Sequence, residues 1–191
     1  KGYLVLIIAC WEAFVEDLAD EAFQFILKEC NSSNIFPKKA KSSVAKKLME
    51  SKNPLDIWVL ADSGWKKKVE SDKKKALEKL NTPSSTKIDE MFLSIIGMKK
   101  LSSSWHWKGM PAKKANEHLG LYIRMRGKIA HRVSVHGKLT EKKLKKILDF
   151  IYRLSTLSNN AVRAYVCMEI NKYPWSSATY KCIRSKYKFI K

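Results

Sequence analysis

The residues best suited to chemistry in this sequence are an arginine and a histidine near the end of a predicted helix. Arg126 lies on a regular apolar face, and His131 follows it five residues later. The face repeats at spacings of 4, 3, 4, 3 and 4 and consists of Ala115, Leu119, Tyr122, Arg126, Ile129 and Val133. A guanidinium and an imidazole could together bind a phosphate group and transfer a proton near neutral pH.

A charge on a buried helix face is costly unless it meets an anion or lies at an interface. Three interpretations of Arg126 fit the sequence. It forms a structural salt bridge with Glu12 or Glu16 of the first helix, or it reaches the surface along its methylene stem. The third interpretation is that Arg126 projects into a phosphate-binding cleft together with His131.

The third interpretation places a condition on the geometry. At ~100° per residue, Arg126 and His131 lie about 140° apart around a straight helix, so one copy of the pair converges poorly on one phosphate. Convergence requires a helix end or a kink at His131, or two copies that face each other across a symmetric dimer. In such a homodimer two arginines and two histidines would line one basic cleft, and the apolar face would pack against the second subunit.

The charge of the whole chain also favours a polyanion as partner. Lysine and arginine total 38 against 18 acidic residues, a formal charge of +20, which favours nucleic acid first and an anionic membrane second. Most of these residues are lysines, so a general bias toward lysine explains part of the excess. Only six are arginines, and Arg124, Arg126 and Arg132 lie within nine residues of one another, where planar bidentate groups suit phosphate.

Other classes of function lack their motifs. The four cysteines and four histidines show no zinc-ligand spacing, and there is neither a Gly-rich phosphate loop nor a nucleophile elbow. We therefore expect no metal and no cofactor. The apolar run over residues 3–11 is shorter than the ~20 residues that span a bilayer, and the basic helices have thin apolar faces. We expect a cytoplasmic protein with reduced thiols and no membrane partner.

The remaining pattern predicts an all-α fold of five or six helices, because the alternation typical of strands is almost absent. We expect a long first helix over residues 3–29, a motif helix from Pro111 to about His131, and a long last helix that Thr140 caps. The chain opens on Lys1 without an initiator methionine, which leaves room for residues upstream.

Shorter helices are expected between these elements. A basic helix is predicted over residues 36–54, an apolar helix that Gly64 interrupts over residues 55–80, and a further helix that Gly97 ends. The helical domain occupies residues 1–172. A tail of basic and aromatic residues, 173–191, packs on this domain or extends from it.

Three stretches of the chain resemble a known family. Residues 126–131, RGKIAH, resemble the R-x4-H signature of HEPN domains, usually seen as Arg-Asn-x-Ile-Ala-His. The preceding WHWKGMPAKKANEHLGLYIRM is similar to the aromatic loop and the start of the motif helix in that family. IIACWEAFVEDLADEAF resembles the first helix of the RiboL-PSP-HEPN branch, where a Trp-Glu pair is typical. The resemblance spans about residues 3–165.

The resemblance implies an all-α HEPN-like bundle that dimerises into a metal-independent endoribonuclease. In such an enzyme Arg126 would hold the scissile phosphate, and His131 would be the general base or acid for attack by the neighbouring 2′-hydroxyl of RNA. The products would be a 2′,3′-cyclic phosphate and a 5′-hydroxyl. Among the neighbouring residues, those expected to contact RNA are Arg124, Lys128 and Arg132, and those expected to support the site are Glu12 and Gly127.

Gly127 departs from the family pattern, in which a polar residue, most often Asn, follows the arginine. Glycine there costs ~1 kcal/mol of helix propensity and removes a side chain that orders the site. The expected consequence is lower activity, unless Arg124, Lys128 or Arg132 compensates.

Two functions therefore fit the sequence beside a purely structural one. The first is an endoribonuclease in a toxin–antitoxin, antiviral-defence or RNA-processing context, with RNA as substrate and an antitoxin or regulatory protein as a further partner. The alternative is a non-catalytic HEPN-type module that binds RNA, a nucleotide or a partner protein through the same basic cleft. A purely structural domain leaves the arginine cluster unexplained.

Overall fold

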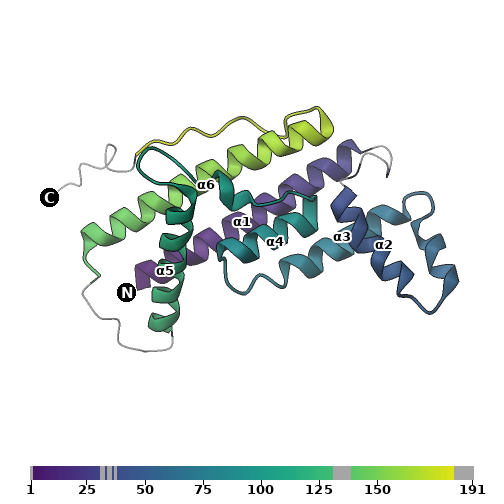
Figure 1. Cartoon of the computed structure of the whole chain (residues 1–191), viewed down its shortest axis with the longest axis horizontal. Coiled ribbons are helices and arrows are strands. Elements are labelled where there is room, and N and C mark those ends of the chain that lie inside the picture. Colours follow the sequence, from purple (N-terminus) through teal and green to yellow (C-terminus); the bar gives the residue numbers. More distant parts are fainter. Residues whose placement is uncertain (1, 31–32, 34–35, 37, 131–138, 183–191) are drawn as a thin grey trace.

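The computed structural model describes residues 2–30, 33, 36, 38–130 and 139–182, and this part of the chain is all-α (Figure 1). It contains six α-helices and two short 3-10 helices. Their bounds are α1 (Gly2–Glu29), α2 (Lys38–Met49), η1 (Pro54–Leu60), α3 (Gly64–Leu77), α4 (Ser85–Ile96), η2 (Leu101–Ser104), α5 (Ala112–Ala130) and α6 (Glu141–Ile170). The predicted helical bundle is confirmed.

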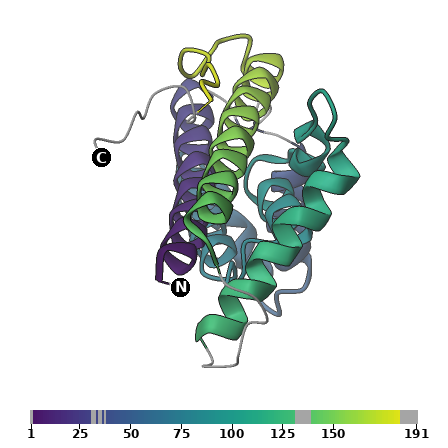
Figure 2. The same cartoon turned by 90° about the vertical axis from the view of Figure 1, so that its left-hand side faces the viewer.

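The two long helices, α1 and α6, lie side by side and run in the same direction (Figures 1 and 2). Each buries one stripe of apolar residues at helical spacing, because only that face meets other helices. The stripe of α1 includes Leu4, Ile8, Trp11, Val15, Leu18, Ala22 and Ile26, and that of α6 includes Ile147, Ile151, Leu154, Val162 and Val166. Helix α4 packs against α1, and α2 and α3 pack against α4.

Two helix ends fall where the sequence predicts them. The side chain of Thr140 accepts a hydrogen bond from the Lys143 amide at 3.3 Å and caps the start of α6. Gly97 ends α4 with φ of 79°, a left-handed conformation that glycine adopts without a Cβ penalty. Helix α6 continues to Ile170, one turn further than the apolar stripe predicted from the sequence.

The connection between α4 and α5 is held by polar contacts that are partly or fully buried. Asp89 of α4 accepts hydrogen bonds from the backbone amide of Ser102 at 2.8 Å and from its hydroxyl at 2.6 Å. Trp105, three residues after Ser102, is fully buried and donates from Nε1 to the Ser158 hydroxyl of α6 at 2.8 Å. These contacts fix where α5 begins.

The prediction of an apolar helix over residues 55–80 is wrong in its first part. Asn53 and Pro54 start the 3-10 helix η1, whose Leu55, Ile57, Trp58 and Val59 are exposed and not part of the core. The segment lies at the end of the molecule opposite α5 (Figure 1). A Cβ added at Gly64 would lie 1.9 Å from the Val59 carbonyl oxygen, so glycine is required where η1 turns into α3.

Candidate active site

Helix α5 carries the arginine motif and crosses one end of the α1–α6 pair. It packs against α1, α4 and η2, and its C-terminal turns extend beyond the other helices (Figures 1 and 2). On the predicted face, Ala115 and Leu119 are fully buried, whereas Tyr122, Arg126 and Ile129 are only half-buried. The face therefore enters the core at its start and emerges from it toward Arg126. Val133 lies outside the described residues.

Arg126 is half-buried, and its Nε is buried without a hydrogen-bond partner among the described residues. The guanidinium forms no ion pair within the part of the chain that the structure describes. The predicted alternative of a salt bridge to Glu12 or Glu16 is therefore not found there. A buried, unsatisfied donor costs about 1–3 kcal/mol, so an anion that reached this nitrogen would bind with that cost removed.

Of the other predicted site residues, Arg124 and Lys128 are exposed on α5. Each is two residues from Arg126, which places it about 160° away around the helix. One subunit therefore does not bring these cations together with Arg126. His131 and Arg132 lie outside the described residues.

Two glycines of α5 differ in the space that surrounds them. A Cβ added at Gly120 would lie 3.4 Å from Nη1 of Arg124, whose side chain folds back along the helix over this glycine. At Gly127 no described atom lies within 4 Å of an added Cβ. Packing within the described structure therefore does not require the glycine that replaces the usual polar residue.

Glu12 and Glu16 lie on α1 and are both half-buried. Neither makes an ion pair or a side-chain hydrogen bond within the described residues. Burial raises the pKa of Glu16 above its usual value of 4.5, and the neighbouring charges of Glu12 and Asp17 raise it further. The acids of α1 therefore repel one another in the folded chain.

Replacing Glu16 with glutamine is expected to raise the Tm at pH 7 by about 1–2 °C, because a gain below 1 kcal/mol moves a chain of this size by only that much. The folded-state pKa lies above the unfolded one, so the cost of a charged Glu16, from burial first and from repulsion second, is absent below pH 4.5 and grows as pH rises toward the folded value. Thermal unfolding at pH 7 and near pH 3 measures this. Equal gains at both pH values, or the same gain from the exposed Glu21→Gln, would contradict it.

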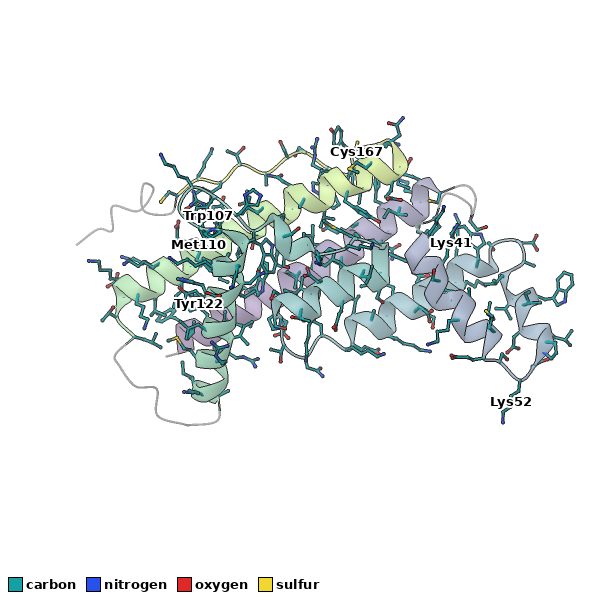
Figure 3. All side chains as sticks on the ribbon, in the orientation of Figure 1. Lys41, Lys52, Trp107, Met110, Tyr122 and Cys167 are labelled. Atoms are coloured by element: carbon teal, nitrogen blue, oxygen red, sulfur yellow. The ribbon has the colours of Figure 1, made fainter. Side chains whose placement is uncertain are left out.

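A row of aromatic rings joins α5 to α6. The ring of Phe150 lies 5.4 Å from that of Tyr122, 6.0 Å from that of His118 and 5.9 Å from that of Trp107. Figure 3 shows Trp107, Met110 and Tyr122 together at this end of the molecule. Burial raises the pKa of Tyr122, which keeps its hydroxyl neutral.

One arginine that sequence reasoning did not select lies beside this row. Arg153 of α6 has its guanidinium carbon 5.0 Å from the ring centroid of Trp107 and 4.0 Å from that of Tyr180. Spacing along the chain gives no signal for this cluster, because the three residues come from segments far apart in the sequence. Its only sequence signal is that arginines are rare in this lysine-rich chain.

The comparison with protein families gives a match that covers most of the chain. The model of the RiboL-PSP-HEPN family matches residues 1–163, which include α1 to α5 and most of α6. Neither a curated protein nor a solved structure matches the chain. Among the described helices, none has the length and apolar character needed to cross a bilayer. HEPN domains are all-α and generally associated with ribonucleases. Through this match and its helical fold, the chain belongs to the RiboL-PSP-HEPN family.

Proposed function

We propose that the protein is a metal-independent endoribonuclease that acts as a homodimer. The observation that carries this proposal is the half-buried guanidinium of Arg126, whose Nε has no hydrogen-bond partner among the described residues. A phosphate oxygen would satisfy this donor, and the charge-assisted hydrogen bond would be stronger than one between neutral groups. Arg126 also opens the R-x4-H motif, which ends at His131 within the family match.

In the proposed reaction the imidazole of His131 takes the proton from a 2′-hydroxyl of RNA, and the 2′ oxygen attacks the adjacent phosphorus. The bond from phosphorus to the 5′ oxygen breaks, and this oxygen takes a proton from water. A 2′,3′-cyclic phosphate and a 5′-hydroxyl result. Arg126 binds the non-bridging oxygens and stabilises the charge that develops on them. Because the 2′-hydroxyl is the nucleophile, DNA is bound but not cleaved.

Helix geometry and exposed apolar surface support the proposed homodimer. Residues five apart on a straight helix diverge by about 140°, so a helical His131 would reach the phosphate held by Arg126 only from the other subunit. The end of the molecule that carries α5 also exposes large apolar side chains. Tyr3 and Leu6 of α1 are 73% and 60% exposed, and Leu121 of α5 is 45% exposed. A symmetric partner would cover such residues.

The cations on the outer side of α5 have a separate role in this proposal. Arg124 and Lys128 are exposed, and they would contact phosphates beside the scissile one, together with Arg132. The biological setting that fits is a cytoplasmic toxin, an antiviral-defence effector or an RNA-processing enzyme, held in check by an antitoxin or regulatory protein. Such control would protect the cell's own RNA from a nuclease that needs no metal.

The test is cleavage of end-labelled RNA in EDTA by the wild-type chain, by His131→Ala and by His106→Ala. His106 is an exposed histidine of the loop before α5 and serves as the matched control. We expect cleavage by the wild type and by His106→Ala, products that end in a cyclic phosphate, and no cleavage by His131→Ala. An RNA with a single 2′-deoxy nucleotide should resist cleavage at that linkage.

Two outcomes would overturn the proposal. A requirement for Mg²⁺ would refute the mechanism, even for a true nuclease. Tight RNA binding without cleavage by the wild type would instead identify the non-catalytic module, with Gly127 as the first position to examine.

A further inference from the structure

We propose that Arg153 forms a second phosphate-binding site, which holds the backbone of single-stranded RNA away from the scissile linkage. The inference rests on the proposed function only in taking RNA as the ligand. Its basis is the cluster of Trp107, Arg153 and Tyr180 in the described structure. The family match ends at residue 163, so the contribution of Tyr180 is a feature of this chain beyond the matched region.

The guanidinium of Arg153 is oriented by aromatic contacts and not by hydrogen bonds. Its carbon lies 5.0 Å from the Trp107 ring centroid and 4.0 Å from that of Tyr180. None of its nitrogens donates to a described residue, and none is both buried and unpaired. Ring contacts restrain a long side chain at little cost to its donors, which stay free for an in-plane pair of phosphate oxygens. The arginine is therefore preorganised for an anion.

Arg163, the next arginine of α6, has a structural role and serves as a comparison for Arg153. Its guanidinium carbon lies 3.7 Å from the Tyr173 ring centroid, and its Nε donates to the Trp175 carbonyl at 2.7 Å. Arg163 thus fastens the segment that follows α6 to the helix. Arg153 has the same kind of aromatic contact without the hydrogen bond, so its donors are unassigned within the described structure.

Both rings that contact Arg153 are themselves held in place. The Tyr180 hydroxyl donates to Asp149 at 2.7 Å, and the segment of residues 171–182 lies along α6, where Asn160 exchanges two hydrogen bonds of 2.8 Å with the backbone of Ala178. Trp107 is fixed by a backbone bridge to Met110 and by its contact with Phe150. The site is therefore built before any ligand arrives.

The local charge favours an anion despite one carboxylate. Asp149 lies one turn before Arg153 and accepts the hydrogen bond from Tyr180, so its charge opposes an incoming phosphate. Two exposed lysines, Lys108 and Lys181, are the chain neighbours of Trp107 and Tyr180. Together with Arg153 they add positive charge to the segments that form the cluster. A polyanion gains from all three, whereas a single free phosphate would not span them.

A chain of ring contacts also connects the cluster with the candidate active site. The ring of Trp107 contacts Phe150, and Phe150 contacts Tyr122 of α5. Tyr122 precedes Arg126 by four residues, which is one turn or ~6 Å along the helix. A strand cleaved at Arg126 could follow α5 toward its N-terminal end and meet Arg153 there. Along the way the partly exposed rings of Trp107 and Tyr122 suit unpaired bases, whereas Phe150 between them is buried.

The test measures binding of a fluorescent single-stranded RNA of about 12 nucleotides, with 2′-O-methyl groups that prevent cleavage, by anisotropy over a range of salt concentrations. Arg153→Gln is expected to weaken the affinity about 10-fold, as for one lost charge-assisted contact, and to flatten the salt slope by ~0.7. Arg163→Gln removes the same charge and a similar ring contact, and it should leave the slope unchanged. Circular dichroism confirms that both variants are folded.

A second variant separates the ring from the charge. Tyr180→Leu keeps the charge of Arg153 but removes the ring that restrains its guanidinium. We therefore expect weaker binding with the wild-type salt slope. Inorganic phosphate, added at the concentration of the strand's linkages, should not displace the RNA. Displacement by phosphate, or equal slopes for Arg153→Gln and the wild type, would overturn the inference. A wild type that binds but does not cleave unmodified RNA would refute only the proposed function.

Discussion

Replacing Arg126 with alanine is expected to lower the rate of RNA cleavage by about 10²–10³-fold, the usual effect of removing one donor to transition-state charge. The Nε of Arg126 has no partner among the described residues, so the folded chain should lose little stability with this side chain. Arg126→Lys should recover little of the rate, because an ammonium lacks the two parallel N–H donors of a guanidinium. Single-turnover cleavage at saturating protein measures the chemical step without binding.

The exposed Arg124 is the matched control for this prediction, since it lies on the same helix two residues away. Arg124→Ala should weaken RNA binding and reduce its salt dependence, with the saturated rate nearly unchanged. If Arg126→Ala instead lowered the Tm by several degrees and left the saturated rate intact, Arg126 would have a structural role and the proposed reaction would fail.

Mixed dimers extend the same experiment to the question of which subunit supplies each group. In a heterodimer of Arg126→Ala with His131→Ala, the intact arginine and the intact histidine belong to different subunits. Because the proposed site takes its arginine and its histidine from different subunits, this heterodimer should regain cleavage that neither homodimer shows. Absence of any recovery in a mixture that demonstrably exchanges subunits would contradict a site shared between subunits.

The sequence predicts much of the fold because the patterns that specify the long helices involve only residues close together in the chain. The stripes of α1 and α6 repeat at helical spacing, and Thr140 and Gly97 cap helices for reasons that involve only neighbouring residues. The 3-10 helix η1 could not be predicted in this way. Leu55, Ile57 and Trp58 are apolar and suggest a core element, yet they are exposed, because η1 packs mainly against α3 and these side chains remain in solvent. Burial depends on tertiary neighbours, which a local pattern does not contain.

The candidate site likewise has one part that a local pattern predicts and one part that depends on tertiary contacts. Arg126 could be found from sequence because it interrupts a regular face. Its half-buried position, without an ion pair to any described residue, agrees with that unusual placement. The cluster around Arg153 could not, because Trp107 precedes α5 and Tyr180 follows α6. The grouping of Arg124 and Lys128 with Arg126 follows from closeness in sequence alone. Helix rotation places them on the other side of α5.

Replacing Trp105 with alanine is expected to destabilise the fold by about 3–5 kcal/mol, the range for removing a fully buried large aromatic side chain. Trp105 is 0% exposed, and its ring lies edge-on to Trp11 of α1 with centroids 5.7 Å apart. Its Nε1 donates to the Ser158 hydroxyl of α6, so one side chain ties η2 to both long helices. Urea unfolding, followed by circular dichroism, measures the free energy of unfolding.

Trp58 is the matched control, since it is the same residue type with 72% of its surface exposed. Trp58→Ala should change the free energy of unfolding by no more than about 0.5 kcal/mol. Ser158→Ala should cost about 1–3 kcal/mol, because it leaves the buried Nε1 of Trp105 without an acceptor, whereas Ser158→Ala in a Trp105→Phe background should cost much less. Equal effects of Ser158→Ala in the two backgrounds would mean that this hydrogen bond does not hold the start of α5, and hence Arg126, in its place.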